Sequence, residues 1–540
     1  MVIEFTKQNT SILNKQVIIM KNYIEEASNI INEQYKLQKG LDEINFSKTI
    51  DWNYKHTISS NTFQLYLHTL NFNNNLVKAF IKTGETKYIV KAKNIIENWI
   101  KENINPEEKV NYAWYDHTVS SRLQNLLYFQ ANAPTKYRIK KKFFSKVFEK
   151  HLEYLRKYKN YTENNHGIMM DRALVIGSLF LEDEEVKNEY LMLAKNRIEK
   201  AILRDYSYKN VHLENSPDYH RMVTNWLNKV VKLFDDIKMP LSSKYKNTLK
   251  GAEVYNGIVV NYNKEYPMIG DTAYGTTKIR KQHNDFIDYE AGMGVFNDRN
   301  TQSTLVFNCG FKNLTHKHKD DLSLTLSIER EQLFVDSGKY NYNRNDIIRK
   351  YMLSPEAHST IFVLNKDYTL NYDSKIEITS SFIHKDYKVL KGIHKGYRDI
   401  NLERTIVFLD DGIYIIVDKA SSNEENTYVQ NFVLDDKVIF ENLGTRKYLL
   451  TTPNKKQYTL QEHSPVAASK ILYGQKSNAM ISKDFNKIED TSRIEIRKKQ
   501  RNSIFITSMS PDSLEVDSIE FENGNLKINA NNQIRVINID

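Results

Sequence analysis

The spacing of apolar residues changes near residue 265, and this change constrains the fold more than any other feature of the sequence. Before it, apolar side chains recur every three or four residues, which is typical of amphipathic helices. The clearest such segments are residues 12–35, 88–104, 143–158 and 222–237. After it, short runs of alternating apolar and polar residues are separated by Asn, Asp, Gly and Lys, which indicates antiparallel strands.

The pattern predicts two domains of different class, an α+β multidomain chain. A chain of 540 residues exceeds what one hydrophobic core usually supports. We expect residues 1–265 to form helical hairpins packed in an arc or a ring. We expect residues 266–540 to form an antiparallel β-sandwich.

Charge and composition exclude several classes of function. The 77 basic and 67 acidic residues give a net charge of +10, which permits an anionic ligand. No zinc-finger spacing, RNA-binding strand motif or basic arm is present, so nucleic acid is not expected as a partner. Cys309 is the only cysteine, which excludes a disulfide framework within the chain. The sequence gives no indication of oligomeric state.

Nothing in the sequence resembles a membrane or export segment. No stretch of about 18 apolar residues occurs, so no membrane span is expected. The first 20 residues lack a basic region followed by a sustained apolar run. The sequence as written therefore predicts a cytoplasmic protein, or a periplasmic or secreted one if a signal has been removed.

Two polar segments of the helical half are candidate binding sites. Asn165 and His166 lie in the run 164–167, just before an apolar helix, where such residues either cap the helix or present an amide and an imidazole to an anion. His117 and Arg122 lie on or near another helix. Arg122 could form a surface salt bridge or bind a substrate carboxylate with its guanidinium fork.

A third segment lies between two helical stretches. Pro217 ends an extended run, and Tyr219 and His220 then open the next helix. Neighbouring Tyr and His residues are usually structural, but on a loop they are also candidates for catalysis.

The fourth segment, residues 314–328, is the most informative. If it is a strand throughout, His316, His318 and Asp320 share a face that Leu322 and Leu324 continue. Imidazoles and a carboxylate at the polar end of a buried stripe need partners or a metal.

Asp336 closes the next predicted strand, and His358 precedes another. His318, Asp336 and His358 could supply two nitrogens and one oxygen to zinc, with water as the fourth ligand. Because these residues are dispersed along the chain, their spacing alone leaves zinc binding open.

Together these segments resemble the heparinase II/III-type polysaccharide lyases, which include heparan-sulfate lyases and related oligoalginate lyases. The resemblance covers NNHG, ENSPDYH, HKHKDDLSL, FVDSGKYNY and AHST, in the family's order, over residues 164–167, 214–220, 316–324, 334–342 and 357–360. It implies an incomplete (α/α) toroid followed by an antiparallel β-sandwich. Lys317 and Ser359 depart from residues that are frequent in the family, which weakens assignment to a subfamily.

The resemblance also implies roles for individual residues. Asn165, helped by His166, neutralises the carboxylate of a uronate. Tyr219 and His316 are the catalytic pair. His318, Asp336 and His358 bind a structural zinc ion, and no organic cofactor is implied. His117, His220 and Arg122 are candidates for substrate contact.

The implied reaction is β-elimination on an acidic, uronate-containing polysaccharide or oligosaccharide, catalysed by a carbon–oxygen lyase. Donors aimed at the carboxylate stabilise the enolate-like intermediate, while a base removes the C5 proton and an acid protonates O4. We expect Tyr219 and His316 to share these two tasks. A glycoside hydrolase would need two carboxylates across the glycosidic bond, and no convincing pair is present. A non-catalytic glycan-binding protein of the same fold is the other alternative, but binding alone would not need both Tyr219 and His316.

Overall fold

The computed structural model describes residues 2–38, 40–46, 49–57, 59–105, 112–444, 446–464 and 468–539. The chain divides into two compact units. Unit 1 comprises residues 1–204 and 229–245, and unit 2 comprises residues 205–228 and 246–540. Helices α10 (Pro217–Asp236) and α11 (Ser243–Val259) each contribute residues to both units. The change from helices to strands falls after Val259, whereas the predicted single boundary at 265–266 does not divide the compact units.

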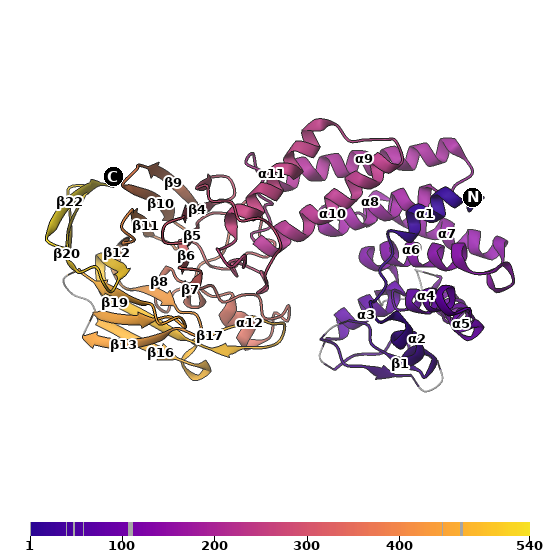
Figure 1. Ribbon diagram of the computed structural model, residues 1–540, viewed down its shortest axis with the longest axis horizontal. Coiled ribbons are helices and arrows are strands. Elements are labelled where there is room, and N and C mark those ends of the chain that lie inside the picture. Colours follow the sequence, from indigo (N-terminus) through magenta and orange to yellow (C-terminus); the bar gives the residue numbers. More distant parts are fainter. Residues whose placement is uncertain are drawn as a thin grey trace. The chain divides into compact units, whose positions relative to one another are not determined.

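Unit 1 is built from helices packed around α6 (Asp116–Asn132), most of whose residues are buried. Helix α6 contacts α1, α3, α4, α7 and α8, as Figure 1 shows in indigo and purple. The other helices are α1 (Lys7–Asn14), α2 (Tyr23–Ile31), α3 (Ser60–Thr69), α4 (Asn73–Thr83), α5 (Thr86–Asn103), α7 (Lys141–Arg156), α8 (Asn165–Ser178) and α9 (Glu184–Asp205). Strands β1 (Gln34–Tyr35) and β2 (Ile44–Asn45) form a short hairpin. Among the described residues, no helix is both long and apolar enough to cross a membrane.

The predicted helix over residues 12–35 is wrong, because the chain leaves helical geometry between α1 and α2. Side chains from other helices bind its backbone there. Asn75 accepts a hydrogen bond from the Met20 N–H at 3.1 Å, and Asn74 donates to the Ile18 carbonyl at 3.1 Å. Arg172 donates to the Gln16 carbonyl at 2.7 Å. These contacts replace the helical hydrogen bonds that the local periodicity predicts.

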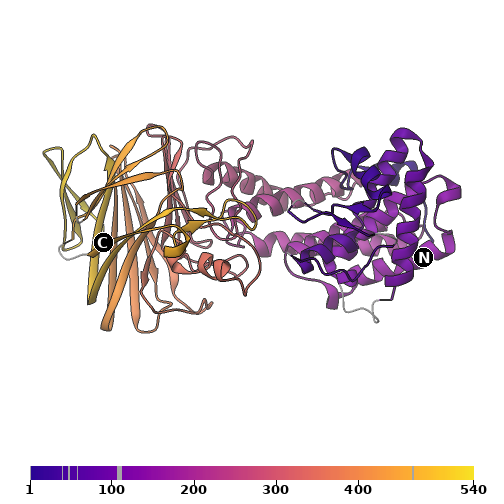
Figure 2. The same cartoon turned by 90° about the horizontal axis from the view of Figure 1, so that it is seen from below.

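Unit 2 contains antiparallel sheets. A five-stranded sheet has the order β3 (Phe286–Asp288), β4 (Met293–Asp298), β5 (Ser303–Asn308), β6 (Ser323–Ile328) and β7 (Glu331–Phe334). A ten-stranded sheet has the order β13 (Ile439–Gly444), β14 (Lys447–Thr451), β15 (Gln457–Glu462), β19 (Ser492–Pro511), β12 (Tyr414–Val433), β11 (Ile400–Leu409), β10 (Tyr387–His394) and β9 (Ile376–Ile383). Strand β16 (Ala468–Tyr473) pairs with β19, and β8 (Ile361–Val363) pairs with β12. Figure 2 shows the long strands running side by side.

The smaller elements of unit 2 complete its layers. A three-stranded sheet is formed by β20 (Val516–Glu522), β21 (Asn525–Ala530) and β22 (Gln533–Asn538). Strands β17 (Met480–Ile481) and β18 (Glu489–Asp490) pair with each other, and α12 (Ile347–Met352) is a short helix.

The hydrophobic cores show how these sheets pack. One cluster combines side chains of the five-stranded and ten-stranded sheets, such as Phe307, Leu324 and Phe432. A second joins the ten-stranded sheet to the three-stranded one. A third packs α11 and residues 211–213 on the five-stranded sheet. The predicted class, a helical N-terminal region followed by antiparallel sheets, is confirmed.

A buried group of hydrogen bonds in the ten-stranded sheet surrounds one carboxyl group. The Thr507 hydroxyl lies 2.6 Å from Glu462 Oε2 and 2.5 Å from Gln430 Oε1. The Thr507 hydroxyl can donate its one hydrogen to either of these oxygens. Burial raises the pKa of Glu462 to about 7, although Thr507 and Lys498 oppose the shift.

Candidate active site

Loops from three parts of unit 2 meet at Gly270. The side-chain amide of Asn215 donates to the carbonyls of Asn313 at 2.8 Å and Thr315 at 2.9 Å. Gly270 has φ +55°, and a Cβ there would lie 2.3 Å from the Asn215 carbonyl oxygen and 2.7 Å from that of His316. Only glycine allows this approach, which places the next residue, Asp271, against the histidine loop.

Asp271 holds two histidines and an arginine. Its Oδ2 accepts from His316 Nδ1 at 3.0 Å, and its Oδ1 accepts from His318 Nε2 at 3.0 Å and Arg349 at 2.6 Å. Burial disfavours the carboxylate, but the bonds from both histidines and the charge of Arg349 hold the pKa of Asp271 well below its ordinary value. Because each histidine donates one N–H to Asp271, its second nitrogen carries the lone pair in the neutral ring.

Tyr219 stacks directly on His316. Their ring centroids lie 3.5 Å apart with 22° between the planes. The Tyr219 hydroxyl lies 2.8 Å from that of Tyr342. Burial raises the pKa of Tyr219 to about 12, with Tyr342 opposing the shift. Tyr219 is therefore a neutral phenol near pH 7, able to donate a proton, beside an imidazole whose Nε2 lies 3.6 Å from Glu214.

Residues 314–322 do not form a strand, so the predicted shared face of His316, His318 and Asp320 is wrong. Strand β6 begins only at Ser323, and His316 has φ +59°. The buried Lys317 ammonium binds Asp320 and lies 3.0 Å from Asp321. These ion pairs lie in the segment where the alternating pattern predicts an extended backbone.

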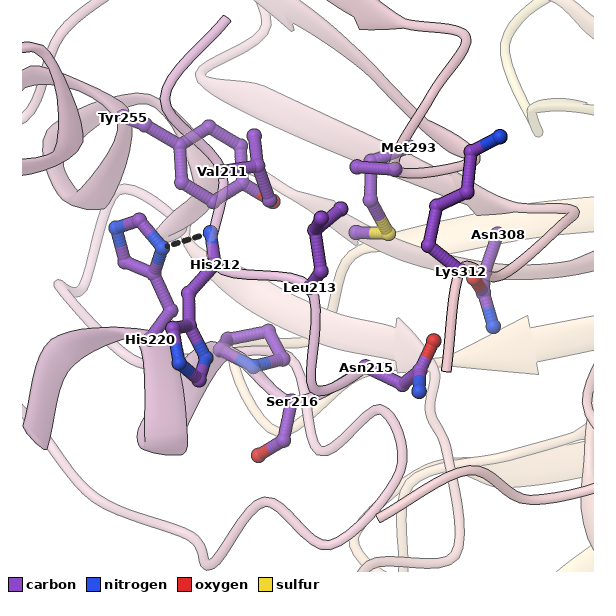
Figure 3. A pocket seen from close by; sticks show the side chains of 12 residues that line it. Val211, His212, Leu213, Asn215, Ser216, His220, Tyr255, Met293, Asn308 and Lys312 are labelled. Carbon is purple, nitrogen blue, oxygen red and sulfur yellow. Dashed lines mark hydrogen bonds between the residues drawn. The ribbon is translucent and has the colours of Figure 1, made fainter. Parts of the chain in front are cut away.

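His220, next to Tyr219 at the start of α10, is bound to the backbone of neighbouring segments. Figure 3 shows its Nδ1 accepting a hydrogen bond from the backbone N–H of His212 at 2.9 Å. Its other nitrogen donates to the Ala252 carbonyl at 2.9 Å. The cavity beside it holds only about 20 Å³, enough for one water molecule and too small for a sugar. With both nitrogens bound and the ring buried, the structure does not support the predicted substrate contact of His220.

His318, Asp336 and His358 form a buried group that could hold a metal ion. Their candidate ligand atoms all lie within 4.8 Å of one another. His358 Nδ1 donates to Asp336 Oδ2 at 2.9 Å. Each residue keeps one buried atom without a hydrogen-bond partner: His318 Nδ1, Asp336 Oδ1 and His358 Nε2. Three unsatisfied buried acceptors, one on each residue, fit a bound cation better than an empty core.

In unit 1, Asn164, Asn165 and His166 form the start of α8. Asn164 caps the helix by accepting from the His166 N–H at 2.8 Å. His166 Nδ1 lies 3.0 Å from Asp116 Oδ1, and its side chain is 30% exposed. Burial disfavours the charged form of Asp116, but hydrogen bonds from His166, His117 and Thr162 lower its pKa overall. Within the described part of the chain, the Asn165 amide has no hydrogen-bond partner, so it is available to a ligand.

His117 and Arg122, both on α6, differ in their surroundings. The ring centroid of His117 lies 6.1 Å from that of His166, and burial, with the nearby His166, lowers its pKa to about 4. Arg122 is fully buried, donates to His68 and His151, and lies 3.9 Å from the Trp99 ring. Arg122 is therefore part of the helical core, and the structure does not support the predicted binding of a substrate carboxylate.

Tyr219 and His316 are thus brought together within unit 2. Asn165 and His166 belong to unit 1, so their convergence with this pair stays a prediction. Sequence reasoning missed Asp271, Arg349 and Tyr342. Asp271 follows a glycine in a turn at the predicted domain boundary, and a carboxylate beside a close-packed glycine was the available signal.

The chain thus consists of a helical region followed by antiparallel sheets. The sheet region carries the Tyr219–His316 pair and a buried His–Asp–His group that could hold a metal ion. Residues 3–299 match the heparinase II/III N-terminus, and residues 289–525 match the heparinase II/III-like C-terminal domain. The chain therefore belongs to the heparinase II/III family.

Similar proteins found by sequence and by structure support this assignment. A heparin-sulfate lyase from Bacteroides stercoris is 21% identical over 476 residues, covering 76% of this chain and 70% of the relative. A crystal structure of heparinase III has a TM-score of 0.82 at 14% identity, covering 99% of this chain and 98% of that one. The heparan sulfate lyase HepC from Pedobacter heparinus has a TM-score of 0.71 at 15% identity, covering 97% and 90%. At such identities the structural matches show the fold.

Proposed function

We propose that this chain is a polysaccharide lyase that cleaves an acidic, uronate-containing glycan of the glycosaminoglycan type by β-elimination. The observation that carries the proposal is the stacked Tyr219–His316 pair, in which Asp271 orients the imidazole. Family membership and the heparin-sulfate lyase relative support it.

The two side chains suit opposite proton transfers. His316 donates Nδ1–H to Asp271, which leaves the Nε2 lone pair to take the C5 proton of a uronate. The C4–O4 bond then breaks, a C4=C5 double bond forms, and the neutral phenol of Tyr219 protonates the departing O4. The reaction yields one unsaturated uronate end and one free hydroxyl, and no water is consumed.

The carboxylate beside C5 must accept charge during proton removal. The free amide of Asn165 and the Asp116-bound His166 are suited to donate to it, as an oxyanion hole does. We assign these two residues to the uronate carboxylate and His117 to an adjacent substrate contact.

We assign zinc to His318, Asp336 and His358, because two imidazole nitrogens and one carboxylate oxygen are typical zinc ligands. Bound there, zinc would supply a structural crosslink between the histidine loop and the strands that follow it. His318 also donates to Asp271, so the Asp271 carboxylate orients both the proposed metal ligand His318 and the proposed base His316.

The test is a substrate screen read by ultraviolet absorbance, because the conjugated C4=C5 bond absorbs and a hydrolysis product does not. Heparan sulfate, heparin, hyaluronan, chondroitin and alginate should be incubated with wild type, Tyr219→Phe and His316→Ala. We expect absorbance to rise with wild type on at least one uronate polymer and to stay near the baseline with both variants. Near-normal rates in both variants would contradict the proposal, and new reducing ends without absorbance would indicate a hydrolase.

A further inference from the structure

Unit 1 carries a groove that the proposed chemistry does not use. It is an open groove of about 890 Å³, and its described lining comes from Asn105, Trp114, the part of α7 from Lys146 onward and the residues just after α7. This volume lies within the range of roughly 300–1,000 Å³ that ligand sites occupy. The described residues that line it all belong to unit 1, and none of them is a proposed catalytic residue.

Two aromatic rings on the groove are held rigidly. The indole N–H of Trp114 donates to the Asn103 carbonyl at 2.7 Å, and the Tyr154 hydroxyl donates to the Trp114 carbonyl at 3.0 Å. Their ring centroids lie 5.8 Å apart. Because the backbone satisfies both polar ends, the rings offer pre-ordered apolar surface at little entropic cost on binding.

Among the described residues, the lysines that line the groove have few acidic partners. Lys146 and Lys159 have no ion pair within the described part of the chain. Lys150 contacts only neutral oxygens here, Asn105 Oδ1 at 3.1 Å and the Ile104 carbonyl at 3.4 Å.

Glu149 and Glu153 also line the groove, but Glu153 is shared by two cations. Arg156 lies 2.8 Å and Lys157 3.9 Å from its oxygens. Among the described lining residues, four lysines therefore stand against two glutamates, and this excess of ammonium groups attracts an anion.

We propose that this groove is a second glycan subsite, which binds an acidic segment of the same polymer chain away from the bond that is cut. Lysine ammonium groups would bind carboxylate or sulfate groups, and a sugar ring would pack on Trp114 and Tyr154. Rigid rings beside unpaired cations favour an acidic glycan over an acidic peptide. The ligand class rests on the proposed function, whereas the presence of an anion site rests on the groove itself.

The experiment measures binding without cleavage, on the full-length His316→Ala background. Calorimetry gives Kd for a heparan sulfate tetrasaccharide and dodecasaccharide, and for hyaluronan oligosaccharides of the same lengths. Adding Lys146→Gln and Lys159→Gln should raise Kd for the dodecasaccharides roughly 5- to 20-fold, as expected for the loss of two partly exposed ion pairs. The effect should shrink with added salt. Loss of affinity for the sulfated ligand alone would assign the site to sulfate, and loss for both would assign it to the carboxylate.

The matched control replaces Lys82 and Lys200 by Gln, which removes the same charge from exposed positions of α4 and α9. Equal Kd values for the groove variant and this control, with all four ligands, would overturn the subsite. Failure of the proposed function is seen separately, as wild type that releases no unsaturated product from any polymer. The subsite would then still be supported by the difference in Kd between groove and control variants.

Discussion

Replacing Asp271 by Asn should separate the orientation of His316 from the binding of substrate. The amide has one acceptor oxygen where the carboxylate has two, but three donors point at this residue. We expect the oxygen to stay with His318 and the charged Arg349, because turning NH₂ toward a cation costs more. The NH₂ group then faces His316 Nδ1 and forces the tautomer with the proton on Nε2.

The expected cost follows from that tautomer. Nε2 can no longer accept the C5 proton, and the same exchange in the Ser-His-Asp triad lowers kcat about 10⁴-fold. We therefore expect kcat to fall roughly 10³- to 10⁴-fold, with KM within a few-fold, because the buried Asp271 does not reach the substrate. The assay is the initial rate of absorbance increase over a range of polymer concentrations, with metal content and melting temperature measured on the same samples.

The matched control is Asp288→Asn. Asp288 is also a buried carboxylate of unit 2, but its hydrogen bonds come from the Ser207 hydroxyl and the backbone N–H groups of Glu290 and Ala291. The Asp288→Asn variant should be less stable than wild type and should keep the wild-type kcat. If folded, metal-loaded Asp271→Asn kept a kcat within about tenfold of wild type, the assigned role of Asp271 would be wrong.

Further predictions concern the acid, the metal and a buried carboxyl group. Tyr219→Phe should lose about 10²- to 10⁴-fold in rate on natural polymer but far less on a uronide with a highly acidic leaving group at C4, which needs no proton; equal losses would refute the acid role. A chelator should lower the melting temperature, and His358→Ala should lack the single metal equivalent that mass spectrometry finds in wild type. Glu462→Gln should raise the melting temperature at pH 8 and change it little at pH 5. Because the pKa of Glu462 is raised from 4.5 to about 7 on folding, stability falls as pH rises through this range, by about 3 kcal/mol in full; an equal effect at both pH values would contradict the assignment.

The sequence predicts those elements whose periodicity agrees with their packing. The periodic segment at 88–104 corresponds closely to α5, and the run LSLTLSI contains β6. The pattern fails where distant side chains decide the backbone, as at residues 15–22, whose carbonyl and N–H groups are bound by Asn74, Asn75 and Arg172. It fails again around Lys317, where the ammonium group binds two carboxylates and the neighbouring His316 has φ +59°.

For the site, the motifs identify residues but not their partners. Tyr219 and His316 are named by the sequence, yet only the structure shows that they stack and that Asp271 orients the imidazole. Arg122 illustrates the opposite case. A conspicuous arginine near a candidate motif lies in the core, where its guanidinium packs on Trp99 and donates to the His151 ring and the His68 carbonyl.

Isotope labelling tests the central claim, elimination rather than hydrolysis, most directly. The preferred polymer should be digested in H₂¹⁸O and the fresh oligosaccharides analysed by mass spectrometry. Elimination predicts products one water lighter than hydrolysis products, with no ¹⁸O incorporated at the cleaved bond. Saturated products carrying one ¹⁸O per cut would contradict the account.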